Sequence, residues 1–168
     1  MSPSFANRRL ELFTALVVIA LDQITKAMLR RALPLHESLP VIPGYVDLTR
    51  VHNTGAAFGM LNTVDFPFKT VVLSIVALVA LGGVAWYAAT VPLNDRLARI
   101  GIAGVLGGAV GNLIDRATTG YVLDFVDAFW HSWHFWAFNV ADAAITIGVA
   151  FMILDILGVG RRSASNPV

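Results

Sequence analysis

The 168-residue sequence has no cysteine and few charged residues, which make up 14% of the chain. Without cysteine, the chain cannot form disulfides, thiolate metal sites or a thiol nucleophile. An ordinary soluble domain has roughly a quarter charged residues, whereas 57% of this chain is hydrophobic. The expected solvent is therefore lipid rather than water.

Basic charge is also scarce, because the formal net charge is only +1 and the 12 Lys and Arg residues are scattered without forming a patch. Nucleic-acid binding depends on a concentrated positive field. We therefore expect no nucleic-acid partner.

Four hydrophobic stretches approach or exceed the length of about 20 apolar residues that crosses a bilayer as a helix. They cover approximately residues 10–29, 71–91, 97–114 and 135–159. Arg8 and Arg9 before the first stretch imitate a secretory signal, but the stretch continues to Leu29 without a small-residue cleavage site. The sequence predicts an all-α membrane protein with four transmembrane helices, forming one integral membrane domain over residues 1–168.

Four spans would place both termini on one side of the membrane, and segments 30–68 and 116–134 on the other. The positive-inside rule favours a cytoplasmic location for the side that carries more arginine. On the side of the termini these are Arg8, Arg9, Arg96, Arg99, Arg161 and Arg162, against Arg30, Arg31, Arg50 and Arg116 opposite. We expect both termini to be cytoplasmic.

Segment 41–52 begins with a Pro-Gly turn and then alternates β-branched or aromatic residues with polar ones. This pattern predicts short strands. Unpaired strands are not stable in lipid, so they should lie at the interface or cover the mouth of the bundle.

Ionisable residues within a span are costly unless they are paired or hydrated. Asp22 and Lys26 are four residues apart on one helical face, which predicts an ion pair, support for a polar site, or both. Asn112 and Arg116 share a face at the end of the third span, with Asp115 beside them. There, a salt bridge between Asp115 and the neighbourhood of Arg116 could anchor the helix end, or the group could support a site.

Glycines in the third span recur at four-residue spacing, at 104 and 108 and again at 107 and 111. Small residues at this spacing let helix backbones approach closely. We expect them to serve helix packing.

Asp142 is harder to explain as a purely structural residue, because it lies within a predicted span. If the fourth helix begins near Trp136, Asp142 lies roughly 9 Å along it, at 1.5 Å per residue, and Asn139 shares its face. Asp124 in the preceding segment could fold back to meet Asp142. Paired carboxylates in a partly dry site share a proton, as in aspartic proteases, although acids in spans also serve proton relays. The spacing alone leaves both uses open.

Five segments of the chain resemble the bacterial lipoprotein signal peptidases, also called signal peptidase II, and they occur in that family's order. They are DQITK at 22–26, NTGAAF at 53–58, GGAVGNLIDR at 107–116, VLDF at 122–125 and FNVAD at 138–142. The resemblance implies an aspartic endopeptidase of the bacterial inner membrane. Such an enzyme removes the signal peptide from prolipoproteins, cutting just before a cysteine that carries diacylglycerol.

Carried over through these motifs, Asp124 and Asp142 are the catalytic dyad. Polar residues expected to support the dyad or bind substrate are Asp22, Lys26, Asn53, Asn112, Arg116 and Asn139. The resemblance also implies a small extracytoplasmic β-cradle between the first and second spans, an active site on that side of the membrane, and no metal or cofactor. Expected partners are prolipoprotein, membrane lipid and globomycin-type inhibitors, and nothing demands more than a monomer.

Rival hypotheses are weaker. A metalloprotease would use Asp127, His131 and His134, but no HExxH sequence is present. A serine–lysine peptidase would pair Ser74 with Lys26, and nothing in the sequence marks Ser74 as a nucleophile.

A small proton or ion carrier would relay charge through the intramembrane acids. In that case polar groups should reach both faces, whereas only Asp155 marks the cytoplasmic half. A lipid-packing scaffold without catalysis is a further class.

Overall fold

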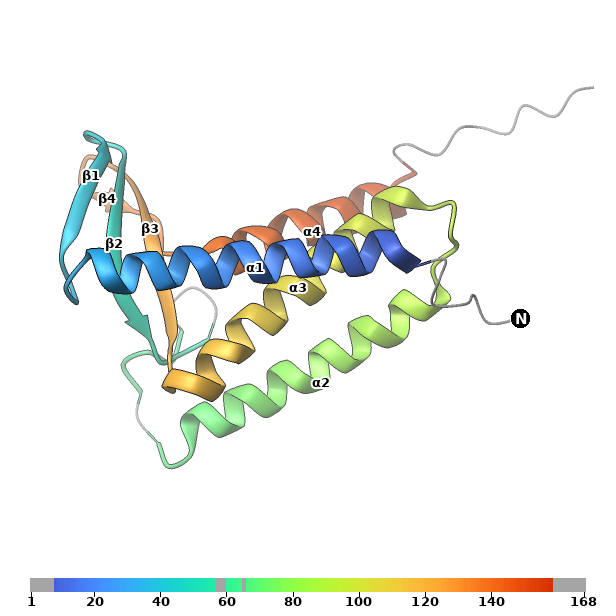
Figure 1. The fold of residues 1–168 in the computed structure, drawn as a ribbon, viewed down its shortest axis with the longest axis horizontal. Helices are drawn as coiled ribbons and strands as arrows, with labels where there is room; N and C mark the ends of the chain where they lie inside the picture. Colours follow the sequence, from blue (N-terminus) through green and yellow to red (C-terminus); the bar gives the residue numbers. More distant parts are fainter. Residues whose placement is uncertain (1–7, 57–59, 65, 159–168) are drawn as a thin grey trace, which may run out of the picture.

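The computed structural model describes residues 8–56, 60–64 and 66–158. Its four helices are α1 (Arg9–Ala32), α2 (Lys69–Thr90), α3 (Arg96–Thr119) and α4 (Val140–Ile156). All four run roughly lengthwise, with α3 in contact with the other three (Figure 1). Among the described residues, α1, α2 and α3 are long and apolar enough to cross a membrane. They correspond to the first three predicted spans.

The fourth helix differs from the prediction of a span over 135–159. It begins at Val140 and has 17 residues, because Asn139 is its N-cap and Phe138 pairs with Val126 in extended conformation. Val159 lies outside the described residues. Hydropathy alone does not separate this apolar extended segment from the helix that follows it.

Close packing of α3 against two helices depends on its small residues. A Cβ atom added at Gly107 would lie 2.8 Å from the Ala15 carbonyl oxygen of α1, and one at Gly104 would lie 3.0 Å from the Ala144 carbonyl oxygen of α4. Larger side chains would force these backbones apart. The expectation that the glycines serve helix packing is confirmed.

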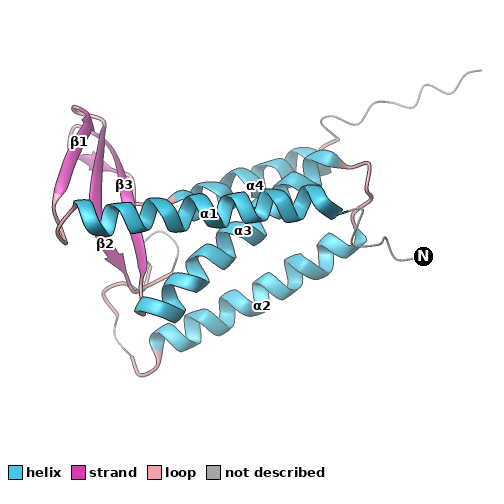
Figure 2. Cartoon of the chain, in the orientation of Figure 1, coloured by secondary structure: helices cyan, strands magenta, loops and turns pink. Residues whose placement is uncertain are grey.

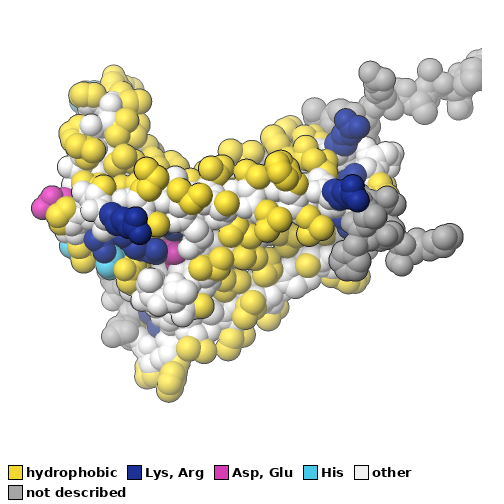
Figure 3. All heavy atoms as spheres, viewed as in Figure 1, with side chains coloured by type: hydrophobic (Ala, Val, Ile, Leu, Met, Phe, Trp, Pro, Cys, Tyr) yellow, Lys and Arg dark blue, Asp and Glu magenta, His cyan; other side chains and the backbone are white. Residues whose placement is uncertain are grey.

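Apolar side chains cover the outside of the helices, and Lys and Arg gather at the two ends (Figure 3). On α2, which has little of its surface buried, Val79 is 72% exposed and Trp86 is 76% exposed. Such surfaces are expected in lipid rather than in water.

A four-stranded antiparallel sheet lies at the end of the bundle remote from the N-terminal end of α1 (Figure 2). Its strands are β1 (Ser38–Ile42), β2 (Val46–Asn53), β3 (Val122–Trp130) and β4 (Trp133–His134), in that order. The predicted strands in segment 41–52 are present as part of β1 and β2. The expectation that the sheet lies between the first two spans is incomplete, since β3 and β4 come from the segment between α3 and α4.

A buried ion pair joins α1 to α3 at the other end of the bundle. Arg99 Nη2 lies 2.7 Å from Glu11 Oε2, and Arg99 Nε donates to Glu11 Oε1 at 2.7 Å. Arg99 also donates to the Leu93 carbonyl oxygen. The statement that only Asp155 marks this half is therefore wrong, because Glu11 and Arg99 are charged and buried there too.

Candidate active site

Asp124 lies on β3 with its side chain turned inward, and the residue is only 3% exposed. Its backbone pairs with Val51 of β2. Asn53 Nδ2 donates to Asp124 Oδ2 at 3.0 Å, and Asn139 Nδ2 donates to Asp124 Oδ1 at 2.7 Å. Both carboxylate oxygens therefore accept a hydrogen bond from an asparagine.

Asp142 lies in the first turn of α4, not the roughly 9 Å along it that a helix starting near Trp136 implied. Asn139 and Asp142 form a capping box, in which Asn139 Oδ1 accepts from the Asp142 amide at 2.9 Å and Asp142 Oδ2 accepts from the Asn139 amide at 3.2 Å. This reciprocal arrangement satisfies amides that a helix start leaves without a partner. Asn112 Nδ2 of α3 donates to the other oxygen, Asp142 Oδ1, at 2.8 Å.

The two acidic residues, Asp124 and Asp142, are thus joined by the fully buried Asn139. Its side chain binds the first carboxylate and the backbone amide of the second, as described above. The structure thus brings the two acids together through this shared partner. Phe138, just before α4, pairs with Val126 of β3 and so holds the start of α4 beside the strand that carries Asp124.

The pKa of the Asp124 carboxyl is raised to about 7, first by burial and then by the negative charge of Asp142. Hydrogen bonds from Asn53 and Asn139 act in the opposite direction by favouring the ionised form. A carboxyl with a pKa near neutrality can hold or release a proton under working conditions. The site can therefore carry out acid–base chemistry near pH 7.

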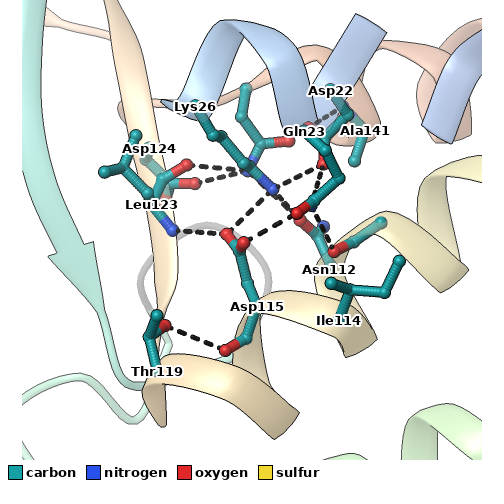
Figure 4. Close-up of polar contacts among 12 residues, drawn as sticks. Asp22, Gln23, Lys26, Asn112, Ile114, Asp115, Thr119, Leu123, Asp124 and Ala141 are labelled. Carbon is teal, nitrogen blue, oxygen red and sulfur yellow. Dashed lines mark hydrogen bonds and ion pairs between the residues drawn. The ribbon is translucent and has the colours of Figure 1, made fainter. Parts of the chain in front are cut away.

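Behind the two carboxylates, Lys26 is fully buried in a polar network (Figure 4). Its Nζ lies 2.8 Å from Asp22 Oδ2, 3.0 Å from Asn112 Oδ1 and 3.1 Å from Asp115 Oδ2. Asp22 Oδ1 also accepts from the Ala141 amide of α4 at 3.0 Å. The predicted ion pair between Asp22 and Lys26 is present, and it belongs to this buried polar network.

Gln23 was not expected near the site, and for Asp115 the sequence left open whether it anchors the helix end or supports a site. Asp115 pairs with Lys26 and, at 2.9 Å, with Arg30, so its ion pairs join α3 to α1. Gln23 Nε2 reaches Asp22 Oδ2 at 3.1 Å and Asp115 Oδ1 at 3.4 Å. Gln23 directly follows Asp22 within DQITK, but its neighbours across the bundle cannot be read from one helix.

Arg116 reaches the loop that follows β2, where its Nη2 donates to the Gly55 carbonyl oxygen at 2.9 Å. The Gly55 amide in turn donates to Asn53 Oδ1 at 2.9 Å. These bonds hold the beginning of the NTGAAF segment beside Asp124. Residues 57 and 58 of that segment lie outside the described residues.

An apolar cavity of about 1000 Å³ opens onto both carboxylates. Side chains of α2, α3, α4 and residues 135–138 line it, and most of them are aliphatic or aromatic. Its polar lining residues are Asn53, Asn112, Arg116, Asp124, Asp142 and Thr146. Asp124 and Asp142 thus lie between this apolar cavity and the polar network around Lys26.

The residues of the rival peptidase hypotheses are arranged differently from what those hypotheses require. His131 has a φ of 56° in the turn between β3 and β4, so His131 and His134 do not share a helical face. His134 Nδ1 lies 3.0 Å from Asp127 Oδ2 on the surface of the sheet. Ser74 donates to the Thr70 carbonyl oxygen at 2.7 Å within α2, whereas Lys26 contacts Asp22 of α1 and Asn112 and Asp115 of α3.

The chain is similar to known proteins over most of its length. The family model of the signal peptidase (SPase) II family, Peptidase_A8, matches residues 14–158. A lipoprotein signal peptidase of Syntrophotalea carbinolica is 46% identical over 151 residues, covering 89% of this chain and 91% of that protein. One from Geobacter metallireducens is 39% identical over 160 residues, covering 95% and 98%.

A solved bacterial membrane enzyme, determined by the in meso method at 2.3 Å resolution, has the same fold with a TM-score of 0.79. It is 29% identical to this chain, and the match covers 94% of this chain and 93% of that one. The family match and the curated relatives together make the assignment: the chain belongs to the signal peptidase II family of aspartic peptidases.

Proposed function

We propose that the chain removes the signal peptide from diacylglyceryl-modified prolipoproteins, cutting before the lipidated cysteine, with Asp124 and Asp142 as its catalytic pair. The observation that carries this proposal is the bridging Asn139, which binds one carboxylate and the backbone of the other at the polar end of an apolar cavity. Family membership supplies the reaction class.

In this mechanism the two carboxyls share one proton. The ionised member takes a proton from the attacking water, while the protonated member polarises the scissile carbonyl and later helps to protonate the leaving amine. The pKa of about 7 at Asp124 supports sharing of this kind near neutral pH. The scheme uses no metal and no cofactor.

The cavity suits a substrate with acyl chains and an apolar signal helix. Leu73, Val76 and Leu81 of α2 face Val105 of α3 and Ile145 of α4 across it. Burial of hydrocarbon against such surfaces is favourable and non-directional. The cavity therefore favours a lipidated substrate over a soluble peptide.

For the membrane arrangement, we propose four spans within a single domain over residues 1–168. At about 1.5 Å per residue, the 17 residues of α4 extend to about 26 Å, close to a hydrocarbon core of about 30 Å. The first residues of α1 and the α2–α3 turn lie at the opposite end from the sheet (Figure 1). We place both termini in the cytoplasm of a bacterium, and the sheet as a cradle on the outer face of its inner membrane.

The supporting roles follow from the contacts. Asn53, Asn112 and Asn139 bind and orient the two acids, and Asp22 and Lys26 hold Asn112 and the start of α4. Arg116 secures the loop at Gly55 beside the cavity. We further propose that the enzyme works as a monomer and is inhibited by globomycin.

The test is cleavage of purified prolipoprotein by the purified full-length protein in lipid vesicles. With a diacylglyceryl-modified substrate, mass spectrometry should find a product that begins at the lipidated cysteine. The same substrate with that cysteine replaced by serine should remain uncut. Cleavage of both substrates at equal rates, or of neither, would contradict the proposal.

A further inference from the structure

Asp115 is a fully buried carboxylate near the C-terminal end of α3. Asp115 Oδ2 lies 3.1 Å from Lys26 Nζ and accepts from the Leu123 amide at 3.0 Å, and Asp115 Oδ1 lies 2.9 Å from Arg30 Nη2. Figure 4 shows this carboxylate between α1 and the first residues of β3. It does not hydrogen-bond either acid of the proposed pair directly in any contact described.

Two routes lead from Asp115 to the proposed catalytic pair. In the first, the bond from the Leu123 amide fixes the backbone immediately before Asp124. The second passes through Lys26 to Asn112, which donates to Asp142. One carboxylate thus contacts the supports of both catalytic acids.

Charge in this network is balanced. Lys26 and Arg30 supply two positive charges, and Asp22 and Asp115 supply two negative ones. Because Lys26 is fully buried, little solvent screens its charge. If its carboxylate partners were lost, its field would favour the fully ionised form of the pair, which has no proton to donate.

We propose that Asp115 is a positioning residue for the reaction, which fixes the start of β3 and opposes the charge of Lys26 so that the pair keeps its shared proton. The inference rests on the proposed function. It assigns to Asp115 an electrostatic effect on catalysis, in addition to the contacts by which its ion pairs hold α1 and α3 together.

Charged groups of α1 and α3 connect Asp115 to the pair. Lys26 and Arg30 form ion pairs with Asp115, and Asp22 pairs with Lys26. Arg116 interacts electrostatically with Asp115 and with both acids of the pair, Asp124 of β3 and Asp142 of α4. A change at Asp115 or Arg30 alters the sum of these charges by one unit. The two changes have opposite signs, which gives the test its direction.

Asp115→Asn keeps the shape of the side chain and an acceptor for the Leu123 amide but removes the negative charge. We expect kcat on diacylglyceryl-modified prolipoprotein to fall about tenfold with KM little changed. The alkaline midpoint of the kcat–pH profile should move down by about one pH unit, because the freed positive charge favours loss of the shared proton. Arg30→Gln should move the same midpoint up.

Glu11→Gln is the matched control. Like Asp115, Glu11 is a buried carboxylate in an ion pair between α1 and α3, but it lies at the other end of the bundle. Glu11→Gln should lower the thermal midpoint of unfolding without moving the alkaline midpoint of kcat. A purely structural role for Asp115 would make Asp115→Asn behave in the same way, and that result would overturn the proposal.

If Asp115→Asn does not fold, Arg30→Gln decides, since the Arg30 side chain is 26% exposed and more tolerant of change. An unmoved or lowered midpoint in Arg30→Gln would overturn the inference. Suppose that the wild type cleaves, that Asp124→Asn is inactive, and that neither Asp115→Asn nor Arg30→Gln moves the alkaline midpoint of kcat. The inference about Asp115 would then be wrong, while the proposed function would stand. Wild-type protein that does not cleave would overturn the proposed function as well.

Discussion

Asn139 Nδ2 donates to Asp124 Oδ1 at 2.7 Å, while the same side chain caps α4 through the Asp142 amide. A residue at a helix start therefore also joins the two acids of the site. Its capping role and its role toward Asp124 use different atoms. Substitutions can separate them.

Asn139→Ser should separate the two roles, because serine can still cap the helix but has no amide to donate to Asp124. We expect a loss of kcat of about tenfold or more, together with some loss of thermal stability, because Asn139 Nδ2 also donates to the Asn112 side chain and the Leu123 carbonyl oxygen. Asn139→Ala should lose the same activity and also about 1 kcal/mol or more of stability, since it removes the cap. Both are measured by calorimetry in detergent and by cleavage assays. Full activity in Asn139→Ser would show that the bond to Asp124 is dispensable.

Gly108→Ala should destabilise the bundle. An added Cβ would meet the Ala141 carbonyl oxygen and would lie 2.8 Å from Ile145 Cγ1, so α4 must shift beside Asp142. Overpacking of this kind costs about 1–3 kcal/mol. Gly82→Ala on α2 is the control, because its Cβ would meet nothing within 4 Å. Equal thermal midpoints of unfolding for the two variants would contradict the close packing of α3 against α4 at Gly108.

Stability should depend on the protonation of Asp124. Its pKa in the folded protein is about 7 against 3.8 for the unperturbed group, mainly because of burial. Protonated Asp124 therefore contributes stability that is fully present below pH 3.8 and is lost as the pH rises through 7. Relative to Asp124→Asn, the wild type should lose thermal stability between pH 4 and pH 8. A constant difference between the two proteins across this range would contradict the raised pKa.

Local spacing was enough to predict part of this structure. Asp22 and Lys26 are four apart on one helix, so their ion pair follows from helical geometry. The packing role of the third-span glycines follows from their four-residue spacing on one helix. The first three spans are visible because long apolar runs in lipid must be helical.

Contacts between distant segments could not be predicted in this way. Strand β3 pairs with β2, which is some seventy residues earlier, as with Val51 and Asp124. Asp115 meets Lys26 and Arg30 across the bundle. Helix periodicity fixes the face of a residue but not its neighbour on another helix.

The start of α4 was missed although a local signal was present. Residues 135–138 are apolar, so hydropathy continued through them, whereas the Asn-x-x-Asp pattern of 139–142 has the spacing of a capping box. Reading that pattern first would have placed Asp142 in the first turn. Its hydrogen bond to Asn139 would then have been expected from the cap.

Cleavage of diacylglyceryl-modified prolipoprotein by Asp124→Asn and Asp142→Asn tests the central claim most directly. Asp127→Asn is the matched control, because it removes a carboxylate from the same strand, β3, at a position that pairs with His134 on the sheet surface. All three proteins are first shown to be folded by thermal unfolding in detergent. We predict that both site variants lose cleavage entirely and that Asp127→Asn cleaves as the wild type does. Substantial cleavage by either site variant would contradict the assignment of the pair.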